Sequence, residues 1–352
     1  MSSCPIWRRM AIGDMTRQII ILGVRIAASA PTRIDLAGGT IDIWPLYLFH
    51  EGALTLNAAI SLRAHATVET GADGVVELRS IDTGRHCRVS HWSELTESSD
   101  VPLLALLARH YRLENATLTT RGESPAGAGI AGSSALAIAV AGALAKHTGA
   151  STDAERLIGV AMNVECQAIK VPTGGQDYRP ACYGGIAALE LGVGGMHRSP
   201  VNVDTKELER RIILAYTGAP RNSGTNNWEI TKRHLDGDRF VFDCFERIRD
   251  TAVALRMALA SGDWDEVGVQ IAREWDNRRR LVPGVTTPAI DALIERATAA
   301  GAAAGKVCGA GGGGCLFCYG PPHAKSTIAE ALTNGGARVL DFAIDTEGLR
   351  FE

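Results

Sequence analysis

A loop built almost entirely of glycine, alanine and serine lies in the middle of the chain and runs into an alanine-rich segment. The loop spans 124–132, and Gly149 follows the segment. We predict a helix here, capped by Ser133 or Ser134 and stopped by Gly149, because hydroxyls favour helix starts and glycine favours helix ends. A flexible loop entering a helix N-terminus presents backbone N–H groups and the positive end of the helix dipole, which together bind phosphate. For a single glycine loop, a plain turn with a helix cap remains the simpler interpretation.

The spacing G-x-G-x-x-G occurs twice, at Gly127/Gly129/Gly132 and at Gly309/Gly311/Gly314. Such a match alone is weak evidence for a dinucleotide site. The first match does not leave a strand directly, and helix capping explains the acidic residues that follow it, Asp153 and Glu155. No Gly-Lys-Ser/Thr follows either loop, which removes the P-loop interpretation as well.

Length and composition limit the classes of protein to which the chain can belong. Its 352 residues exceed the size of about 250–300 residues at which a single core stops growing, so we expect two domains. A net charge of -3 and an apolar fraction of 46% exclude a strongly basic nucleic-acid binder and a disordered chain. We find no bilayer-spanning stretch and no secretory signal, and therefore expect a cytoplasmic protein without nucleic-acid or membrane partners.

Eight cysteines lack the regular spacing of a disulfide framework, which indicates free thiols in a reducing compartment. Cys315 and Cys318 lie in an apolar run that predicts a buried strand, where positions three apart point to opposite faces. Because no second pair has zinc-site spacing, we expect no structural zinc.

Strand-like and helix-like patterns occur in both halves of the chain, which predicts an α+β fold. The polar stretch 192–209 marks a domain boundary, so we expect a tail at 1–16, a first domain at 17–200 and a second at 201–352. Apolar periodicity predicts the remaining elements. Helices are expected at 102–111, from Ser133 to about 148, from a capping box at Thr152 and Glu155 to about Lys170, and at 226–234, 240–260, 264–281 and 288–300; strands are expected at 19–30, 53–69, within 74–90, and at 116–120, 186–191, 211–217, 315–319 and 338–343, with a loop at 171–185.

Glu165 interrupts an apolar helical stripe formed by Ile158, Met162 and Ile169. A buried carboxylate must be paired or must bind a cation, because burying a bare charge is prohibitive. Two interpretations stay open: a salt bridge to an internal arginine, and a magnesium ligand beside the phosphate loop, where Ser133 or Ser134 could add a hydroxyl.

Asp177 ends the glycine-rich sequence Pro-Thr-Gly-Gly-Gln-Asp. Catalytic groups concentrate on loops held by rigid elements, and a carboxylate there could accept a proton from a substrate hydroxyl. Taken alone, Asp177 could equally be a turn aspartate.

Residues 30–42 join a predicted strand to a glycine turn that carries Arg33, Thr40 and Asp42. Such a group suits hydrogen bonding to a polyhydroxylated ligand, with Arg33 free to stabilise developing negative charge. A surface hairpin with a salt bridge is the alternative.

Together, these segments resemble the GHMP kinases, named for galacto-, homoserine, mevalonate and phosphomevalonate kinases. The likeness runs from about Arg25 to the end of the chain. Ala-Pro-x-Arg with Ala-Gly-Gly-Thr-x-Asp resembles the family's sugar-binding first motif, residues 125–135 resemble the ATP-phosphate motif, and residues 306–314 resemble the third motif. The loop Gly-Gly-Gln-Asp, the turn from Tyr216 to Arg221 and the stretch 283–291 are most similar to bacterial D-glycero-D-manno-heptose 7-phosphate kinases.

The resemblance implies a two-domain fold, with an N-terminal ribosomal-protein-like α/β sandwich and a C-terminal ferredoxin-like domain. It implies Asp177 as general base and Arg33 near the attacking oxygen. It also implies ATP and Mg²⁺, the metal being held by Glu165 with Ser133 or Ser134; an ungapped match favours Ser133. The ATP phosphates would contact Gly127, Ala128, Gly129, Ile130, Ala131, Gly132, Ser133 and Ser134. The sugar would contact Arg33, Thr40, Asp42, Gly174, Gly175, Gln176, Asp177 and Tyr216, with Arg221 on a distal phosphate.

The chain departs from the family pattern at two places. Ile130-Ala131-Gly132 stands where the family commonly has Gly-Leu-Gly. Tyr178, Arg179 and Pro180 follow Asp177, where the family often has glutamine and small residues. The second departure bears on which sugar is used.

The resemblance implies an ATP-dependent kinase that converts D-glycero-D-manno-heptose 7-phosphate to the 1,7-bisphosphate, for nucleotide-activated heptose in capsule or lipopolysaccharide synthesis. One alternative is another sugar kinase of the family, acting on galactose, fucose or a uronic acid. A non-catalytic sugar-binding protein is a second alternative, against which the retained Asp177 and Glu165 argue. A dinucleotide-binding oxidoreductase comes last, and a homodimer is left open.

Overall fold

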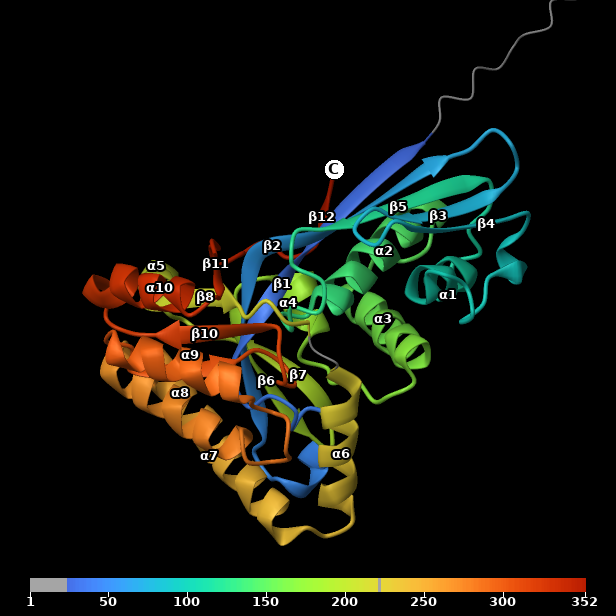
Figure 1. Ribbon diagram of the computed structural model, residues 1–352. Helices are drawn as coiled ribbons and strands as arrows, with labels where there is room; N and C mark the ends of the chain where they lie inside the picture. The colour runs from blue at the N-terminus through green and yellow to red at the C-terminus, as the bar shows by residue number, and fades with distance from the viewer. Residues whose placement is uncertain (1–23, 221–222) are drawn as a thin grey trace, which may run out of the picture.

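Two β-sheets organise the chain, one built mainly from each half (Figure 1). The computed structural model describes residues 24–220 and 223–352. The expected tail at 1–16 and the start of the first expected strand lie outside these residues. The chain changes sheets between residues 200 and 212, near the expected boundary, whose limits stay a prediction.

The first sheet is almost wholly antiparallel and has the order β12-β1-β2-β5-β3-β4. In addition, β6 pairs with the N-terminal part of β2, and β7 pairs with β6. Only β3 and β5 pair in parallel among the described strands. The strands are β1 (Arg25–Ala37), β2 (Leu54–Thr70), β3 (Val76–Ser80), β4 (Arg85–Val89), β5 (Ala116–Gly122), β6 (Ile186–Gly192), β7 (Gly195–Pro200) and β12 (Arg350–Phe351). This arrangement differs from the doubly wound parallel sheet of a dinucleotide-binding domain.

The second sheet is antiparallel and has the order β11-β8-β10-β9. Its strands are β8 (Ile212–Tyr216), β9 (Ala304–Val307), β10 (Cys315–Tyr319) and β11 (Arg338–Leu340). Sheets of this kind with helices packed on them confirm the α+β class. Figure 1 shows β1 and β2 running from the part that holds α1 to α3 down to the part that holds the C-terminal helices.

The helices divide between the two sheets. Against the first sheet lie α1 (Pro102–His110), α2 (Gly132–Thr148), α3 (Ala154–Ile169) and α4 (Tyr178–Tyr183). The second half supplies α5 (Thr205–Arg211), α6 (Ser223–Leu235), α7 (Arg239–Ser261), α8 (Trp264–Arg278), α9 (Pro288–Ala299) and α10 (Lys325–Asn334). Short 3₁₀ turns are η1 (Leu46–Phe49), η2 (Trp92–Glu94) and η3 (Pro322–Ala324). Within the described parts of the chain, no helix has both the length and the apolar character that crossing a bilayer requires.

Alanine is what places α2 against the sheet. The helix packs on β1 and β2, and its residues from Ala135 to Ala145 are buried except Leu136. Small side chains allow the helix axis to approach the strands closely, so the start of α2 has a fixed position against β1 and β2. The loop 124–132 therefore enters a fixed helix N-terminus.

Several local predictions are wrong in detail. Ala131, in a left-handed conformation, is the N-cap of α2, so Ser133 and Ser134 lie inside the first turn instead of capping it. Asp153, not Thr152, caps α3 and accepts a hydrogen bond from the N–H of Arg156. Both errors arise because a serine, threonine or aspartate within two positions of the helix start fits the same cap pattern.

Other elements were missed because they are short. The expected loop 171–185 contains α4, the expected boundary stretch contains β7 and α5, and β9 precedes the second glycine cluster. The predictions for α1, for the end of α2 at Gly149, for α7 to α9, and for β6, β8 and β10 are confirmed to within a few residues.

Candidate active site

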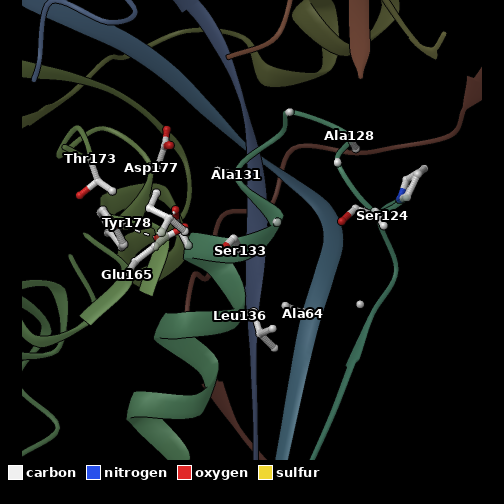
Figure 2. A pocket seen from close by; sticks show the side chains of 18 of the residues that line it. Ala64, Ser124, Ala128, Ala131, Ser133, Leu136, Glu165, Thr173, Asp177 and Tyr178 are labelled. Atoms are coloured by element: carbon white, nitrogen blue, oxygen red, sulfur yellow. Dashed lines mark hydrogen bonds between the residues drawn. The ribbon is translucent and has the colours of Figure 1, made fainter. Parts of the chain in front are cut away.

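An open cleft of about 390 Å³ lies at the start of α2 (Figure 2). The loop 124–132 forms one wall, and the segment 171–178 with α3 forms the other. In Figure 2, Thr173, Asp177, Tyr178 and Glu165 gather on one side, with Ser124 and Ala128 across from them. Of the predicted phosphate-loop residues, Ile130 does not line the cleft and is buried in the core, whereas the other seven line it.

Backbone contacts from two distant segments hold this loop. The N–H of Arg33 donates to the carbonyl of Ile130 at 2.9 Å, and the N–H of Cys315 donates to the carbonyl of Ala128 at 2.6 Å. Gly314 has φ +77°, and a Cβ there would lie 2.6 Å from the Ala128 oxygen. The second glycine cluster therefore packs directly against the loop, because only glycine permits so close a contact between the two backbones.

The N-terminus of α2 opens into the cleft without a side-chain cap. Its first turn holds no acidic residue, and Gly132, Ser133 and Ser134 line the cleft. The first N–H groups of a helix have no partner within the helix and carry the positive end of its dipole. This arrangement suits the phosphate chain of a nucleotide.

Glu165 is buried beside this helix start, with 6% of its surface exposed. Its Oε2 accepts hydrogen bonds from the hydroxyls of Ser134 at 2.9 Å and Tyr178 at 2.7 Å. Burial raises the pKa of Glu165, and the hydroxyls of Ser133, Tyr178 and Ser134 partly offset that rise. No arginine pairs with it in the described chain, so the salt-bridge interpretation fails and the cation-ligand interpretation stays.

Asp177 is the N-cap position of α4, yet its side chain makes no capping hydrogen bond. Instead, Nε of Arg33 donates to its Oδ1 at 3.0 Å, and Nη2 donates to the same oxygen. The carboxylate keeps 26% of its side chain exposed, whereas Arg33 keeps 1%. The turn-aspartate interpretation is therefore excluded, and a partly buried carboxylate is held in place by a buried cation.

Arg33 also reaches the phosphate loop, because its Nη1 donates to the carbonyl of Gly129 at 3.1 Å. Burial would lower the pKa of Arg33, but the charges of Asp177 and Asp35 outweigh that effect and raise it. Arg33 thus stays cationic between the loop and Asp177. The surface-hairpin interpretation of residues 30–42 is wrong, because β1 is buried along most of its length.

A second, smaller pocket adjoins the cleft at Gly174, Asp177 and Asn227, which line both. Its other lining residues include Arg33, Thr40, Asp42, Gln176 and Arg278. Asp42 accepts hydrogen bonds from the backbone N–H of Gln176 at 2.9 Å and from its side-chain amide at 3.1 Å. Burial and the nearby charge of Asp177 raise the pKa of Asp42 to about 7. Gly174 is required here because a Cβ would collide with the Asp42 carboxylate.

A network of buried charged side chains packs behind the smaller pocket and contacts its lining residues Thr40 and Gly309. Asp35, Glu274 and Lys306 have no exposed surface, and Arg278 keeps 2%. Lys306 lies 3.1 Å from Glu274 and 3.4 Å from Asp35, while Arg278 donates to Thr40 Oγ1 at 3.1 Å and to the Gly309 carbonyl at 2.6 Å. Burial alone would raise the pKa of Asp35, but the cations Lys306, Arg278 and Arg33 lower it to about 2.

Sequence reasoning missed this network. Asp35 and Lys306 lie inside the glycine motifs, and Arg278 begins an Arg-Arg-Arg run that resembles a solvated surface. Only the apolar residues around Lys306 signal its burial. Asn227 gave no signal at all.

Two predicted sugar contacts, both in the described part of the chain, do not line either pocket. Tyr216 ends β8 with its ring beneath Arg338, and Gly175 faces Met196. Arg221 lies outside the described residues.

Comparisons with known proteins match this arrangement. The model of the GHMP kinases N terminal domain matches residues 101–185, and that of the GHMP kinases C terminal region matches 255–338. The chain belongs to the GHMP kinases. It is therefore an ATP-dependent phosphotransferase with an alcohol group as acceptor.

Individual GHMP kinases resemble the chain over nearly its whole length. A D-glycero-alpha-D-manno-heptose 7-phosphate kinase of Campylobacter jejuni is 26% identical over 92% of this chain and 98% of its own. A mevalonate kinase of Thermococcus onnurineus is 25% identical over 94% and 99%. The crystal structure of a D-glycero-D-manno-heptose 1-phosphate kinase from Bacteroides thetaiotaomicron has a TM-score of 0.75 at 24% identity, covering 93% and 98%, which confirms the two-domain fold.

The donor set beside the phosphate loop of this GHMP kinase fits a hard cation. Among the described residues, no group of three or more His, Cys, Asp and Glu side chains could hold a metal. A cation here would have Glu165 and a serine hydroxyl as protein ligands, and Mg²⁺ combines one or two such oxygens with substrate phosphates.

Proposed function

We propose that this GHMP kinase transfers the γ-phosphoryl group of ATP to the anomeric hydroxyl of D-glycero-D-manno-heptose 7-phosphate. The observation that carries the proposal is the position of Asp177, which lies where the phosphate cleft and the smaller pocket meet. A sugar hydroxyl in the smaller pocket would face both this carboxylate and a phosphate in the cleft. In-line transfer requires this arrangement.

In the proposed reaction, Asp177 accepts the proton of the sugar hydroxyl as a new bond forms between that oxygen and the γ-phosphorus. The bond from the γ-phosphorus to the bridging oxygen breaks, and ADP leaves. Arg33, held between Asp177 and the carbonyl of Gly129, offsets negative charge together with the N-terminus of α2. Thr40 and Asp42 would bind sugar hydroxyls. Mg²⁺, bound by Glu165 and Ser133 or Ser134, would neutralise charge on the transferring group.

Similarity to the Campylobacter jejuni heptose 7-phosphate kinase supports the substrate. Another acceptor is the second candidate. It is favoured by similarity to mevalonate kinases and to an L-fucokinase/L-fucose-1-P guanylyltransferase of Bacteroides fragilis, which is 26% identical over 91% of this chain. A sugar kinase acting on an unphosphorylated sugar would need no distal cation. Arg221→Ala separates the two, because it should raise KM for a phosphorylated sugar and have little effect on KM for an unphosphorylated one.

The experiment is coupled ADP release with magnesium-ATP across heptose 7-phosphate, mannose, galactose, fucose and glucuronate. Wild type is compared with Asp177→Asn, for which we expect kcat to fall about 10²–10⁴-fold. Turnover restricted to heptose 7-phosphate supports the proposal. Turnover on another sugar overturns the substrate, and an unimpaired Asp177→Asn overturns the assignment of the base.

A further inference from the structure

Tyr178 is the first residue of α4 and follows the proposed base directly in sequence. Its side chain has no exposed surface and packs in the core between the first sheet and its helices. At its far end, the phenol hydroxyl donates to Oε2 of Glu165 at 2.7 Å. Two consecutive residues therefore have different parts in the site. Asp177 is the proposed base, and Tyr178 donates a hydrogen bond to the proposed metal ligand, Glu165.

The hydrogen bonds to Glu165 fix the orientation of its carboxylate. Ser134 and Tyr178 both donate to Oε2, from α2 and α4 respectively. The terminal torsion of glutamate is broad when nothing restrains it. Two donors on one oxygen define the carboxylate plane and allow the other oxygen to bind a cation.

Tyr178 is itself restrained. The side chain of Thr173, on the loop before α4, lies close enough to the Tyr178 hydroxyl to influence its pKa, and both residues line the cleft. The acceptor that the phenol hydroxyl contacts is Glu165. The chain from Thr173 through Tyr178 to Glu165 runs along one wall of the cleft (Figure 2).

We propose that Tyr178 is a positioning residue for the divalent cation, acting through Glu165. The proposal rests on the proposed function, in which Glu165 is a ligand of Mg²⁺. Groups that hold a metal ligand by a hydrogen bond typically contribute 10–100-fold to metal affinity. The alternative is a core tyrosine whose hydroxyl merely needs an acceptor.

The test compares two tyrosines of the same helix. Tyr178→Phe removes only the hydroxyl bonded to Glu165. Tyr183→Phe is the matched control, because Tyr183 donates at 3.0 Å to a glutamate outside the cleft, Glu155. Mg²⁺ is titrated into each protein, saturated with ADP, in a calorimeter, and kinase assays follow KM for the sugar and the Mg²⁺ dependence of kcat.

We expect Tyr178→Phe to weaken Mg²⁺ binding about tenfold. Its sugar KM should stay within twofold of wild type, and excess Mg²⁺ should restore kcat. Tyr183→Phe should bind Mg²⁺ as wild type does. Thr173→Val, which loosens Tyr178 without altering Glu165, provides a second variant if Tyr178→Phe does not fold; it should weaken Mg²⁺ binding in the same direction.

Glu165→Gln separates the failure of this inference from the failure of the proposed function. If Glu165→Gln loses Mg²⁺ binding while Tyr178→Phe keeps it, the positioning role is overturned and the metal site stands. If neither variant changes Mg²⁺ affinity, the metal site itself is overturned. A Tyr178→Phe protein that melts earlier but binds Mg²⁺ normally also refutes the positioning role.

Discussion

Arg33 and Asp177 lie 144 residues apart in sequence, yet the Nε of Arg33 donates to Oδ1 of Asp177 at 3.0 Å. The same guanidinium reaches the carbonyl of Gly129 on the phosphate loop. One buried cation therefore sets the distance between the group proposed to take the proton and the loop proposed to hold the phosphates. A planar guanidinium can do this because its donors form a rigid fork.

Arg33→Lys tests this geometry. An ammonium keeps the charge but cannot donate to Asp177 and Gly129 in the fixed directions of the guanidinium, so we expect kcat to fall at least about 10²-fold. Steady-state kinetics with ATP and the sugar measure the effect. Arg25→Lys on the same strand is the control, since Arg25 pairs with Glu69 at the surface. Equal kcat for both variants would contradict the role.

Gly314→Ala tests the support beneath the phosphate loop. Its Cβ would lie 2.6 Å from the Ala128 oxygen at φ +77°, so the loop must shift. We expect KM for ATP to rise several-fold and stability to fall by about 1–3 kcal/mol. Gly336→Ala, at φ +90° with open space around it, isolates the cost of the backbone conformation alone. If the two variants share one ATP KM, the contact with the loop has no effect on binding.

Lys306→Met should destabilise the protein by about 3–5 kcal/mol, because Asp35 and Glu274 would lose one of the two buried cations that they share, Lys306 and Arg278. Urea unfolding followed by circular dichroism gives this difference. Exposed Lys206→Met should change stability by less than about 0.5 kcal/mol. A Lys306→Met protein as stable as wild type would show that the network does not need the ammonium.

Acid should destabilise the fold through His234. This residue lies between His50, Phe242 and Phe245, and burial together with His50 lowers its pKa to about 4. The unfolded chain takes up a proton near pH 6.5 and the folded chain does not, so stability falls as pH drops from about 6.5 towards 4.

Between pH 7.5 and 5, this histidine should lower the free energy of unfolding by about 2 kcal/mol. Urea unfolding at the two pH values, for wild type and His234→Gln, measures this contribution. His50 faces Glu246 and Arg249 as well, and its Nε2 lies 2.8 Å from that of His234, so the difference between the two proteins belongs to the coupled His50–His234 pair. Identical pH dependence in the two proteins would contradict the assignment.

Local patterns were enough to predict the site's outline. Glycine at Gly127 and Gly129 identified the loop, and the apolar stripe around Glu165 correctly indicated a buried carboxylate. These signals are local, since each depends on residues within one turn or one helix. They could not identify the partners: the hydroxyls on Glu165 come from α2 and α4, and α4 itself is only six residues long.

The ion network escaped prediction for a different reason. Asp35, Glu274 and Lys306 come from β1, α8 and β9, and their pairing depends on how the two sheets meet. A charged residue read alone is expected to be solvated, so burial of all three follows only from the tertiary structure.

The last strand has a consequence for how the protein is made. In β12, Phe351 pairs with Ala28 and Arg350 with Ser29, and the carbonyl of Gly348 with Asp345 neutralises the buried Arg63 of β2. The ribosome synthesises β1 more than 300 residues before β12. Until residues 345–351 have emerged, β1 keeps an open edge and Arg63 has its Ser29 contacts but lacks Asp345 and Gly348. The first sheet is thus completed only after the second half has been synthesised, and deletion of residues 345–351 would damage the half of the protein that was made first.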